Sequence, residues 1–240
     1  MHIDTHCLLD NHLYFLSHHR GILDSYPDAD LIHSEKEFFN IIFLHSPENI
    51  YSLPDSYKIY IPDECVDCKK LPESYSQMGT LSYMILPEHQ VAWKINLDIS
   101  CKKVETTEDM EEFSRVQVRG FNESDTEYNE WHPWIQGYNM KNIQDPAQSF
   151  WIAYRENQPV GVCLTVRTKN CIGIYAVATL AEERNKGIST SVMASAIQQA
   201  GRQAGEHVSL QVFSNAYAHN FYRNLGFVDA FECAIFSKVK

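Results

Sequence analysis

The chain has 240 residues, a length that suits one large domain or two small ones with enough material for a buried core. Its formal net charge of -11 argues against a nucleic-acid-binding surface, because phosphate contacts require clustered Lys and Arg. No apolar run approaches the roughly eighteen residues of a membrane helix, and the first residues lack the basic-then-apolar order of a secretory signal. We therefore expect a cytoplasmic protein with neither nucleic acid nor membrane as a partner, and the oligomeric state stays open.

The first part of the chain carries scattered structural signals. A helix is predicted over Leu8–Arg20, and an apolar run follows at Phe38–Leu44. Tyr57–Ile61 is a strand candidate, and prolines on either side of it mark loops. These signals predict a small α/β domain.

A clearer pattern begins at Thr106. Thr106–Gly120 opens with a Thr-x-x-Asp capping box and ends on glycine, which predicts a helix. Asn122–Asn142 is rich in acidic and aromatic residues without steady periodicity, so we expect a long loop or short irregular helices there. Two strands, Phe150–Arg155 and Val160–Arg167, are predicted to form a hairpin.

Strands and helices alternate in the rest of the chain. We expect a strand over Cys171–Ala178, a helix from Lys186 to near Gly205, a strand over Val208–Val212, a short helix over Asn215–Asn224 and a final strand or strand pair over Phe231–Val239. This order predicts an α/β fold with a mixed central sheet flanked by helices. We expect it to form a domain of residues 99–240, preceded by a smaller N-terminal α/β accessory domain of residues 1–98.

Cysteines and histidines raise the question of a metal site. The 7 cysteines are an odd number, and several lie in apolar segments, as reduced thiols do. Cys65 and Cys68 have the spacing of half a zinc site or a redox pair, but no second pair completes a four-ligand site, so a loop is favoured. The histidines near the start are His2, His6, His12, His18 and His19. Histidines on a terminal amphipathic helix are more often surface residues than ligands, so we expect no metal.

A charged turn between a predicted strand and a predicted helix is a candidate anion site, because unpaired backbone amides and the helix dipole point at whatever binds there. Gly187 would allow close backbone approach. The hexapeptide Arg184–Ser189, RNKGIS, resembles the pyrophosphate-binding motif of the GNAT superfamily of acyl-CoA-dependent N-acetyltransferases, Gln/Arg-x-x-Gly-x-Gly/Ala. Ser189 stands in place of the final Gly or Ala.

A second motif follows at Asn215–Phe227, NAYAHNFYRNLGF. It resembles the later GNAT motif, in which Asn begins a helix, Tyr follows seven residues on, and the helix ends in a Leu-Gly-Phe turn. Two spaced motifs in matching elements are much more specific than either alone. The resemblance covers roughly residues 100–240 and implies a GNAT-like fold there.

The resemblance also implies acetyl-CoA as co-substrate. Amides of the turn would hold its pyrophosphate, small residues on the preceding strand would let the pantetheine arm pair with that strand, and a backbone N–H there would stabilise the oxyanion. Tyr222 occupies the place of the general acid that protonates the CoA thiolate. The expected cofactor-binding residues are Ala176, Val177, Ala178, Arg184, Asn185, Lys186, Gly187, Ile188, Ser189 and Asn215.

The activity that the resemblance implies is an N-acetyltransferase, which moves an acetyl group from acetyl-CoA to the amine of an unidentified small-molecule or peptide acceptor by direct attack in a ternary complex. The alternative is a catalytically inactive CoA-binding or regulatory GNAT-like module, suggested by Ser189 and by Leu210, which stands where some members carry a Glu base. Glu130, His132 or a water relay stay open as the base. An acidic group is expected to attract a cationic amine: Glu123, Asp125, Glu127 and Glu130.

Residues 1–98 carry one more resemblance. Met78–Leu86 echoes the end of a GNAT domain, where a glycine turn is followed by two strands. The N-terminal domain is then either a degenerate GNAT-like half or an unrelated accessory domain.

Overall fold

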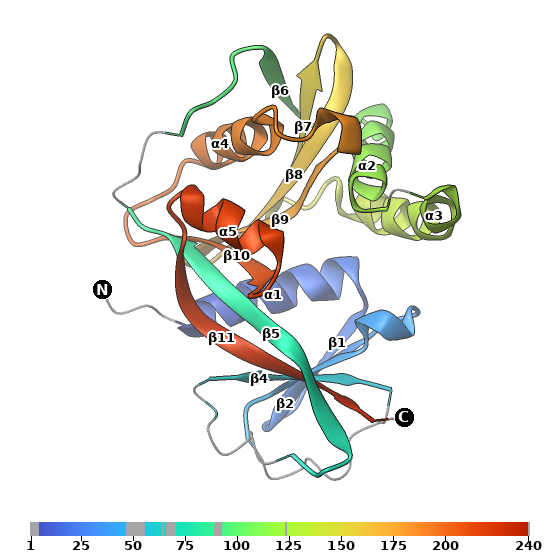
Figure 1. Cartoon of the computed structure of the whole chain (residues 1–240), viewed down its shortest axis with the longest axis vertical. Coiled ribbons are helices and arrows are strands. Elements are labelled where there is room, and N and C mark those ends of the chain that lie inside the picture. The colour runs from blue at the N-terminus through green and yellow to red at the C-terminus, as the bar shows by residue number, and fades with distance from the viewer. Residues whose placement is uncertain are drawn as a thin grey trace. The chain divides into compact units, whose positions relative to one another are not determined.

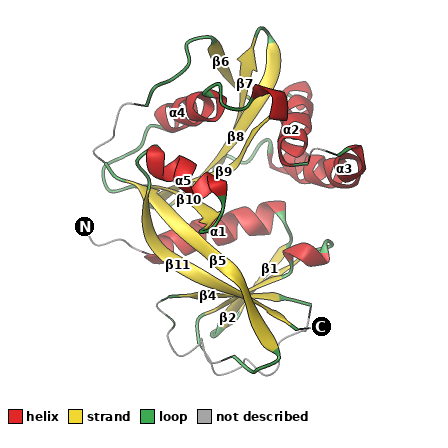
Figure 2. Cartoon of the chain, in the orientation of Figure 1, coloured by secondary structure: helices red, strands yellow, loops and turns green. Residues whose placement is uncertain are grey.

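The chain folds into two compact units in the computed structural model, which describes residues 5–46, 56–63, 65, 71–88, 93–122 and 124–239. Unit 1 comprises Met1–Pro87 with Leu210–Lys240, and unit 2 comprises Glu88–Ser209. The predicted α/β class, with mixed β-sheet and flanking helices, is confirmed (Figure 2). The predicted division into domains 1–98 and 99–240 stays a prediction, and the compact units differ from it because the last residues of the chain return to the first unit.

Unit 1 contains a sheet whose strands come from both ends of the chain. Its elements are α1 (Thr5–His19), β1 (Ile22–Ser25), β2 (Ala29–His33), η1 (Glu37–Phe39), β3 (Ile41–Leu44), β4 (Lys58–Pro62), β5 (Tyr75–Leu86), α5 (Tyr217–Asn224) and β11 (Val228–Lys238). The strand order is β1-β2-β3-β4-β11-β5, in which β3 and β4 are parallel and the other neighbours antiparallel. In Figure 1 the C-terminal strand β11 runs beside β5. The sheet therefore has a strand from the end of the chain in its interior.

The predicted N-terminal helix is confirmed as α1, and its histidines take different roles. His12 is buried, and its Nδ1 lies 2.7 Å from the hydroxyl oxygen of Tyr83 on β5. Burial and the charge of Arg20 lower the pKa of His12 to about 3, so its ring is neutral at pH 7. His18 stacks on Tyr14. Both side chains therefore have roles in packing.

Unit 2 is an antiparallel sheet with helices on both faces. Its elements are β6 (Ile99–Lys103), α2 (Thr107–Phe121), α3 (Asp125–Asn142), β7 (Gln148–Arg155), β8 (Gln158–Thr168), β9 (Cys171–Thr179), η4 (Ala181–Glu183), α4 (Ile188–Ala200) and the start of β10 (His207–Phe213). The strand order is β6-β7-β8-β9, and β9 then pairs in parallel with β10. Figure 1 shows these strands between α4 on one face and α2 on the other.

Local signals fix several elements of unit 2 as the sequence predicts. The Thr106 hydroxyl caps α2 by accepting from the amide of Asp109 at 3.1 Å. The β7–β8 hairpin closes through Glu156 and Asn157, both with positive φ, which is the geometry that matches the twist of paired strands. The capping box and the hairpin turn are thus both confirmed.

The prediction for residues 122–142 is wrong, because Asp125–Asn142 forms one helix, α3, despite Pro133 inside it. Ser124 caps this helix by accepting from the amide of Glu127 at 3.2 Å. Apolar periodicity is weak because the buried contact with α2 is polar: the side-chain amide of Asn139 donates to Ser114 and Gln117 at 2.9 and 2.8 Å. A helix that packs through polar side chains has no hydrophobic stripe, so its sequence lacks the periodic pattern that predicts a helix.

Smaller differences concern element ends. Helix α4 ends at Ala200 with left-handed Gly201, well before Gly205, because glycine adopts that conformation at a helix C-terminus. The final strand is single, and Met78–Leu86 lies within the continuous strand β5, so the expected glycine turn is absent there. The strands β1, β2 and β6 were not predicted, and each has only four or five residues.

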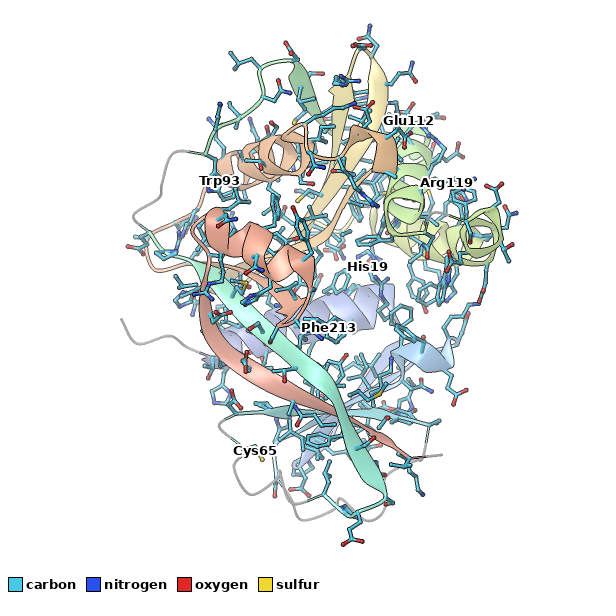
Figure 3. All side chains as sticks on the ribbon, viewed as in Figure 1. His19, Cys65, Trp93, Glu112, Arg119 and Phe213 are labelled. Carbon is cyan, nitrogen blue, oxygen red and sulfur yellow. The ribbon has the colours of Figure 1, made fainter. Side chains whose placement is uncertain are left out.

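Cysteine usage differs from the expected reduced state at one position. Cys65, labelled in Figure 3, is disulfide-bonded, and Cys68 lies outside the described residues. The free cysteines of the described chain are Cys7, Cys101, Cys163, Cys171 and Cys233.

Two glycines allow helices to approach the end of β9 closely. A Cβ at Gly120 of α2 would lie 2.8 Å from the Cβ of Ala178 and 3.1 Å from the amide nitrogen of Thr179. A Cβ at Gly161 of β8 would lie 2.4 Å from Ile188 at the start of α4. The end of β9 and the start of α4 are therefore packed against positions that only glycine fits.

We expect Gly120→Ala to lower the free energy of unfolding by about 1–3 kcal/mol, the usual cost of overpacking, because its neighbours include the backbone of β9. Gly137 on α3 is the matched control, since nothing lies within 4 Å of a Cβ there. Gly137→Ala should raise stability by about 0.5–1 kcal/mol through helix propensity. Urea denaturation measures both, and two stabilising substitutions would contradict the close packing at Gly120.

Candidate functional site

Strand β9 carries a bulge at Ala176 and Val177, two of the expected cofactor-binding residues. Val162 of β8 pairs with Ala178 and Leu164 with Tyr175, so Ala176 and Val177 together oppose one residue of β8. Ala176 has a φ of 51°, in the left-handed region. Bulges of this kind turn backbone groups out of the ladder and often lie at functional sites.

On its other edge, β9 pairs with β10 over only a short stretch. Parallel pairing with β10 covers Cys171–Gly173 of β9 and His207–Ser209 of β10. The segment Ile174–Thr179, which includes the bulge, lies beyond these pairs. This edge of unit 2 offers the backbone groups that an extended ligand could pair with.

The chain reverses after β9 and begins α4 without a capping side chain. Asn185 and Gly187 have φ values of 64° and 76°, and Gly187 stands at the N-cap position. Among the described residues, none accepts a hydrogen bond from the backbone amides of residues 185–190. Several amides are thus available at a helix N-terminus, where the dipole favours an anion.

Charged side chains around this turn are largely paired with one another. Glu183 accepts from Arg155 at 2.9 Å and from Lys186 at 3.1 Å. Burial would raise the pKa of Glu183, but Lys186 and Arg155 outweigh it and hold the pKa below its usual range. Arg184 donates to the carbonyl oxygen of Gly120 at 3.1 Å. Arg155 was not predicted for this site, because it lies on β7, far away in sequence.

Ser189 connects the start of α4 to the end of β9. Its Oγ lies 2.8 Å from Oγ1 of Thr179, which is buried. Ile188 is also buried, whereas Asn185 and Gly187 are exposed. The residue that departs from the GNAT motif therefore braces the turn with its hydroxyl, and none of the residues that the structure describes accepts a hydrogen bond from its amide.

The second motif lies in unit 1. Asn215 is exposed and precedes α5, whose N-cap is Ala216. Tyr222 on α5 is half-buried, and its ring meets that of Phe227 edge-on at 5.8 Å. The predicted Leu-Gly-Phe turn ends the helix, with Gly226 at a φ of 93°. The sequence thus predicts the helix and its stop, but Asn215 is not the cap.

A polar cluster that the sequence did not predict holds α5 to the sheet of unit 1. His219 of α5 lies 2.7 Å from Asp229 of β11, and Asp229 accepts from Ser82 of β5 at 2.9 Å. Burial would raise the pKa of Asp229, but the bonds from His219 and Ser82 lower it. Ser214 donates to Glu232 at 2.9 Å beside this group. These residues are far apart in sequence, so no local pattern signals them.

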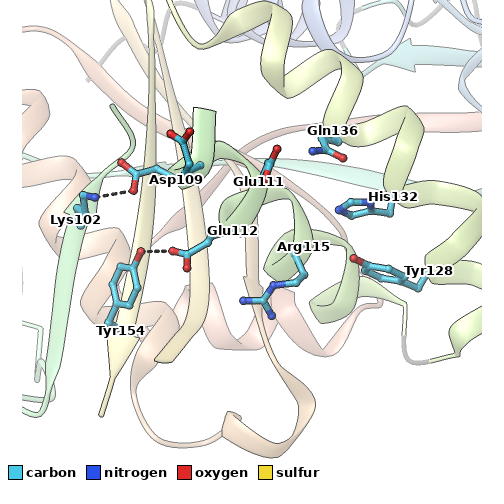
Figure 4. A pocket seen from close by; sticks show the side chains of 10 residues that line it. Lys102, Asp109, Glu111, Glu112, Arg115, Tyr128, His132, Gln136 and Tyr154 are labelled. Carbon is cyan, nitrogen blue, oxygen red and sulfur yellow. Dashed lines mark hydrogen bonds and ion pairs between the residues drawn. The ribbon is translucent and has the colours of Figure 1, made fainter. Parts of the chain in front are cut away.

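A separate groove of about 810 Å³ runs over the outer face of α2 in unit 2 (Figure 4). Two of its carboxylates are already engaged: Asp109 with Lys102 at 2.6 Å, and Glu112 with the hydroxyl of Tyr154 at 2.6 Å. Its lining residues are Lys102, Glu108, Asp109, Glu111, Glu112, Arg115, Tyr128, His132, Gln136 and Tyr154. The charges of the carboxylates in the groove are thus partly offset by an ion pair and a hydrogen bond to neighbouring side chains.

The acidic residues predicted to attract an amine are spread along the start of α3. Asp125 forms an ion pair with Arg119 at 2.7 Å, and Glu127 accepts from the Ser124 hydroxyl. Arg119 lies on α2, as Glu112 does, and both are labelled in Figure 3. Glu123 lies outside the described residues, and Glu130 lies on α3.

His132, a candidate base, lines the groove and stacks on Tyr128 with ring centroids 4.8 Å apart. Burial and the charges of Arg115 and Arg119 lower its pKa, so the ring is neutral at pH 7. Its role as a base stays a prediction.

None of the described helices is both long and apolar enough to cross a lipid bilayer. Within the described ranges, His, Cys, Asp and Glu side chains nowhere gather in threes as a metal site requires.

The left-handed Gly187 gives a stability prediction for the turn. We expect Gly187→Ala to lower the free energy of unfolding by about 1–2 kcal/mol, the cost of an L-residue in this conformation. A Cβ would only touch that of Asn96 at 3.6 Å, so the cost is backbone strain rather than a clash. Gly187→Asn should cost less, because Asn tolerates this region. Urea denaturation compares the variants, and equal stability of all three proteins would contradict the left-handed turn.

Comparison with known proteins gives a family and a set of similar structures. The model of the Acetyltransferase (GNAT) family matches residues 107–227, just over half of the 240-residue chain. No curated protein sequence matches the chain.

Three solved structures show the likeness of fold. A GCN5-related N-acetyltransferase from Kribbella flavida shares 12% identity over 100% of this chain and 97% of that chain, with a TM-score of 0.70. One from Sphaerobacter thermophilus shares 15% identity over 89% and 81%, with a TM-score of 0.63. A functionally unknown conserved protein from Staphylococcus epidermidis ATCC 12228 shares 16% identity over 90% and 93%, with a TM-score of 0.61. Identities this low are evidence of a common fold alone.

Proposed function

Because the chain belongs to the GNAT acetyltransferase family, we propose that it is an N-acetyltransferase that transfers the acetyl group of acetyl-CoA to the amine of a small-molecule or peptide acceptor. The observation that carries the proposal is the turn before α4, where the amides of residues 185–190, at a helix N-terminus, have no acceptor in the described part of the chain. A pyrophosphate has the charge and the acceptor oxygens that such a turn binds. The turn lies within residues 107–227, which the family model matches.

For the pyrophosphate, the proposed ligands are backbone groups of Arg184–Ser189. Gly187 has no side chain to obstruct an approaching phosphate, and Ile188 anchors the helix start by burial. Lys186 contributes positive charge that Glu183 offsets in part. Asn215, exposed before α5, is the proposed contact to the pantetheine arm.

For the thioester, the bulge of β9 supplies the proposed backbone partners. Ala176, Val177 and Ala178 have small or medium side chains, and the bulge removes part of this strand from regular pairing with β8. An amide aimed away from the ladder can polarise the thioester carbonyl and stabilise the oxyanion of the tetrahedral intermediate.

The proposed reaction proceeds in a ternary complex. The neutral amine attacks the carbonyl carbon and a C–N bond forms, while the amine proton passes to a base, for which Glu130, His132 and a water relay are the candidates. The C–S bond breaks when the tetrahedral intermediate collapses. The leaving thiolate of CoA takes a proton, which we assign to the Tyr222 hydroxyl. Tyr222 is half-buried and held by aromatic neighbours, as a residue with a fixed proton donor requires.

Binding of the co-substrate is tested by thermal unfolding with acetyl-CoA, CoA or ATP. A ligand at a hundredfold its dissociation constant should stabilise the protein by about 2.7 kcal/mol, and we expect this for both CoA species but not for ATP. Release of free thiol from acetyl-CoA in the presence of a panel of amines then measures turnover. Absence of binding by either CoA species would overturn the proposal, and binding without thiol release would overturn the enzymatic part of it.

We expect Tyr222→Phe to lower kcat for thiol release by about a hundredfold, the usual contribution of a general acid, with CoA affinity unchanged. Tyr217→Phe is the matched control, because Tyr217 begins the same helix and its side chain is 84% exposed. Steady-state thiol release and CoA titration measure the two quantities. Normal turnover of Tyr222→Phe would exclude Tyr222 as the acid.

A further inference from the structure

Asn96, in the segment that precedes β6, forms hydrogen bonds to the turn before α4 and to the start of α4. Its side-chain amide donates to the carbonyl oxygen of Lys186 at 2.9 Å, and its backbone amide donates to the Ser191 hydroxyl at 3.0 Å. Its side-chain oxygen accepts from the amide of Asp98 at 3.0 Å, which fixes the orientation of the side chain. Every polar group of the Asn96 side chain is thus used within unit 2.

The bond to Lys186 determines where an amide of the turn points. The carbonyl of Lys186 and the amide N–H of Gly187 belong to one planar peptide group, and in a trans peptide they point in opposite directions. By holding the carbonyl toward itself, Asn96 directs the Gly187 N–H to the opposite side. That N–H has no acceptor among the described residues.

The bond to Ser191 ties the same residue to the first turn of α4. Ser191 is buried, and its own amide donates to the Gly187 carbonyl at 3.0 Å. Asn96 therefore holds the turn on both sides of Gly187, at Lys186 before it and at Ser191 after it. A β-carbon at Gly187 would lie 3.6 Å from that of Asn96, so the two backbones are close.

The neighbours of Asn96 have no comparable role. Ile95 and Leu97 are large apolar residues with exposed fractions of 50% and 89%. Side chains this exposed contribute little burial, so the polar contacts of Asn96 hold the stretch of residues 95–97 in place. Asn96 therefore couples this stretch to the turn.

We propose that Asn96 is a positioning residue of the cofactor site: it orients the Lys186–Gly187 peptide so that the Gly187 amide faces the pyrophosphate of an acyl-CoA. The inference rests on the proposed function and adds to it a residue outside the resembling motif. It also makes the segment before β6 part of the cofactor site, since the turn depends on a hydrogen bond from that segment. Asn96 contacts the turn, not the reacting atoms.

The test compares a ligand that contains the pyrophosphate with one that lacks it. Asn96→Leu keeps the size of the side chain but loses the donor to Lys186 and the acceptor for the Asp98 amide, and Asn96→Ala loses both with a smaller side chain. Neither substitution adds a charge beside the pyrophosphate. Titrations with CoA and with acetylpantetheine give the affinities. We expect both variants to bind CoA about five- to tenfold more weakly, as for the loss of one hydrogen bond, and acetylpantetheine as wild type does. With acetyl-CoA, KM should rise by a similar factor while kcat is retained.

Leu97→Ala is the control, because its exposed side chain adjoins Asn96 and should change neither affinity. Should Asn96→Ala fail to fold, Asn96→Leu alone decides the comparison. Unchanged CoA affinity in a folded variant, or equal weakening toward both ligands, would overturn the positioning role while the proposed function stands. Wild-type protein that binds neither ligand would overturn the proposed function and this inference with it.

Discussion

The close packing of two helices against the end of β9 is the constraint on which the candidate site depends. Gly120 brings α2 against Ala178 and Thr179, and Gly161 makes room for the first residue of α4. With the strand end fixed from both sides, the chain can bulge, reverse through left-handed residues and start α4 with amides that have no acceptor within the described ranges. The site therefore depends on residues that have no functional groups themselves, because a β-carbon at either glycine would shift the strand or the helix.

Electrostatics at the turn come from oriented amides more than from free positive charge. The protein carries a formal charge of -11, and the cations beside the turn are partly neutralised by Glu183. A helix N-terminus supplies about half an elementary charge in a fixed direction, and its amides add directed hydrogen bonds. An acidic protein can thus bind an anion at one point without an extended basic surface.

The sequence predicts elements whose signals are local and misses those that depend on distant residues. The cap at Thr106, the hairpin through Asn157 and the strand–turn–helix around Gly187 each follow from a few neighbouring residues. Helix α3 escapes prediction because its interface is polar, and the short strands at the start of the chain because they are formed by pairing. At the candidate site, the motif gives the turn, but Arg155 and Asn96 come from segments far away in sequence. The spacing of residues along the sequence cannot identify such partners when the fold is unknown.

The place of β11 in unit 1 affects how the protein folds during its synthesis on the ribosome. This strand pairs with β4 on one side and with β5 on the other. An inner strand of the unit 1 sheet is therefore synthesised after the other strands of that sheet. Until residues 228–238 have emerged, β4 and β5 lack the neighbour that satisfies their backbone groups, whereas Glu88–Ser209 contains all the strands it needs for β6 to β9. Contacts of such long sequence separation form slowly. The strands of unit 2 would then pair before the sheet of unit 1 is complete. The N-terminal strands would need protection from premature pairing until the ribosome has added well over a hundred further residues.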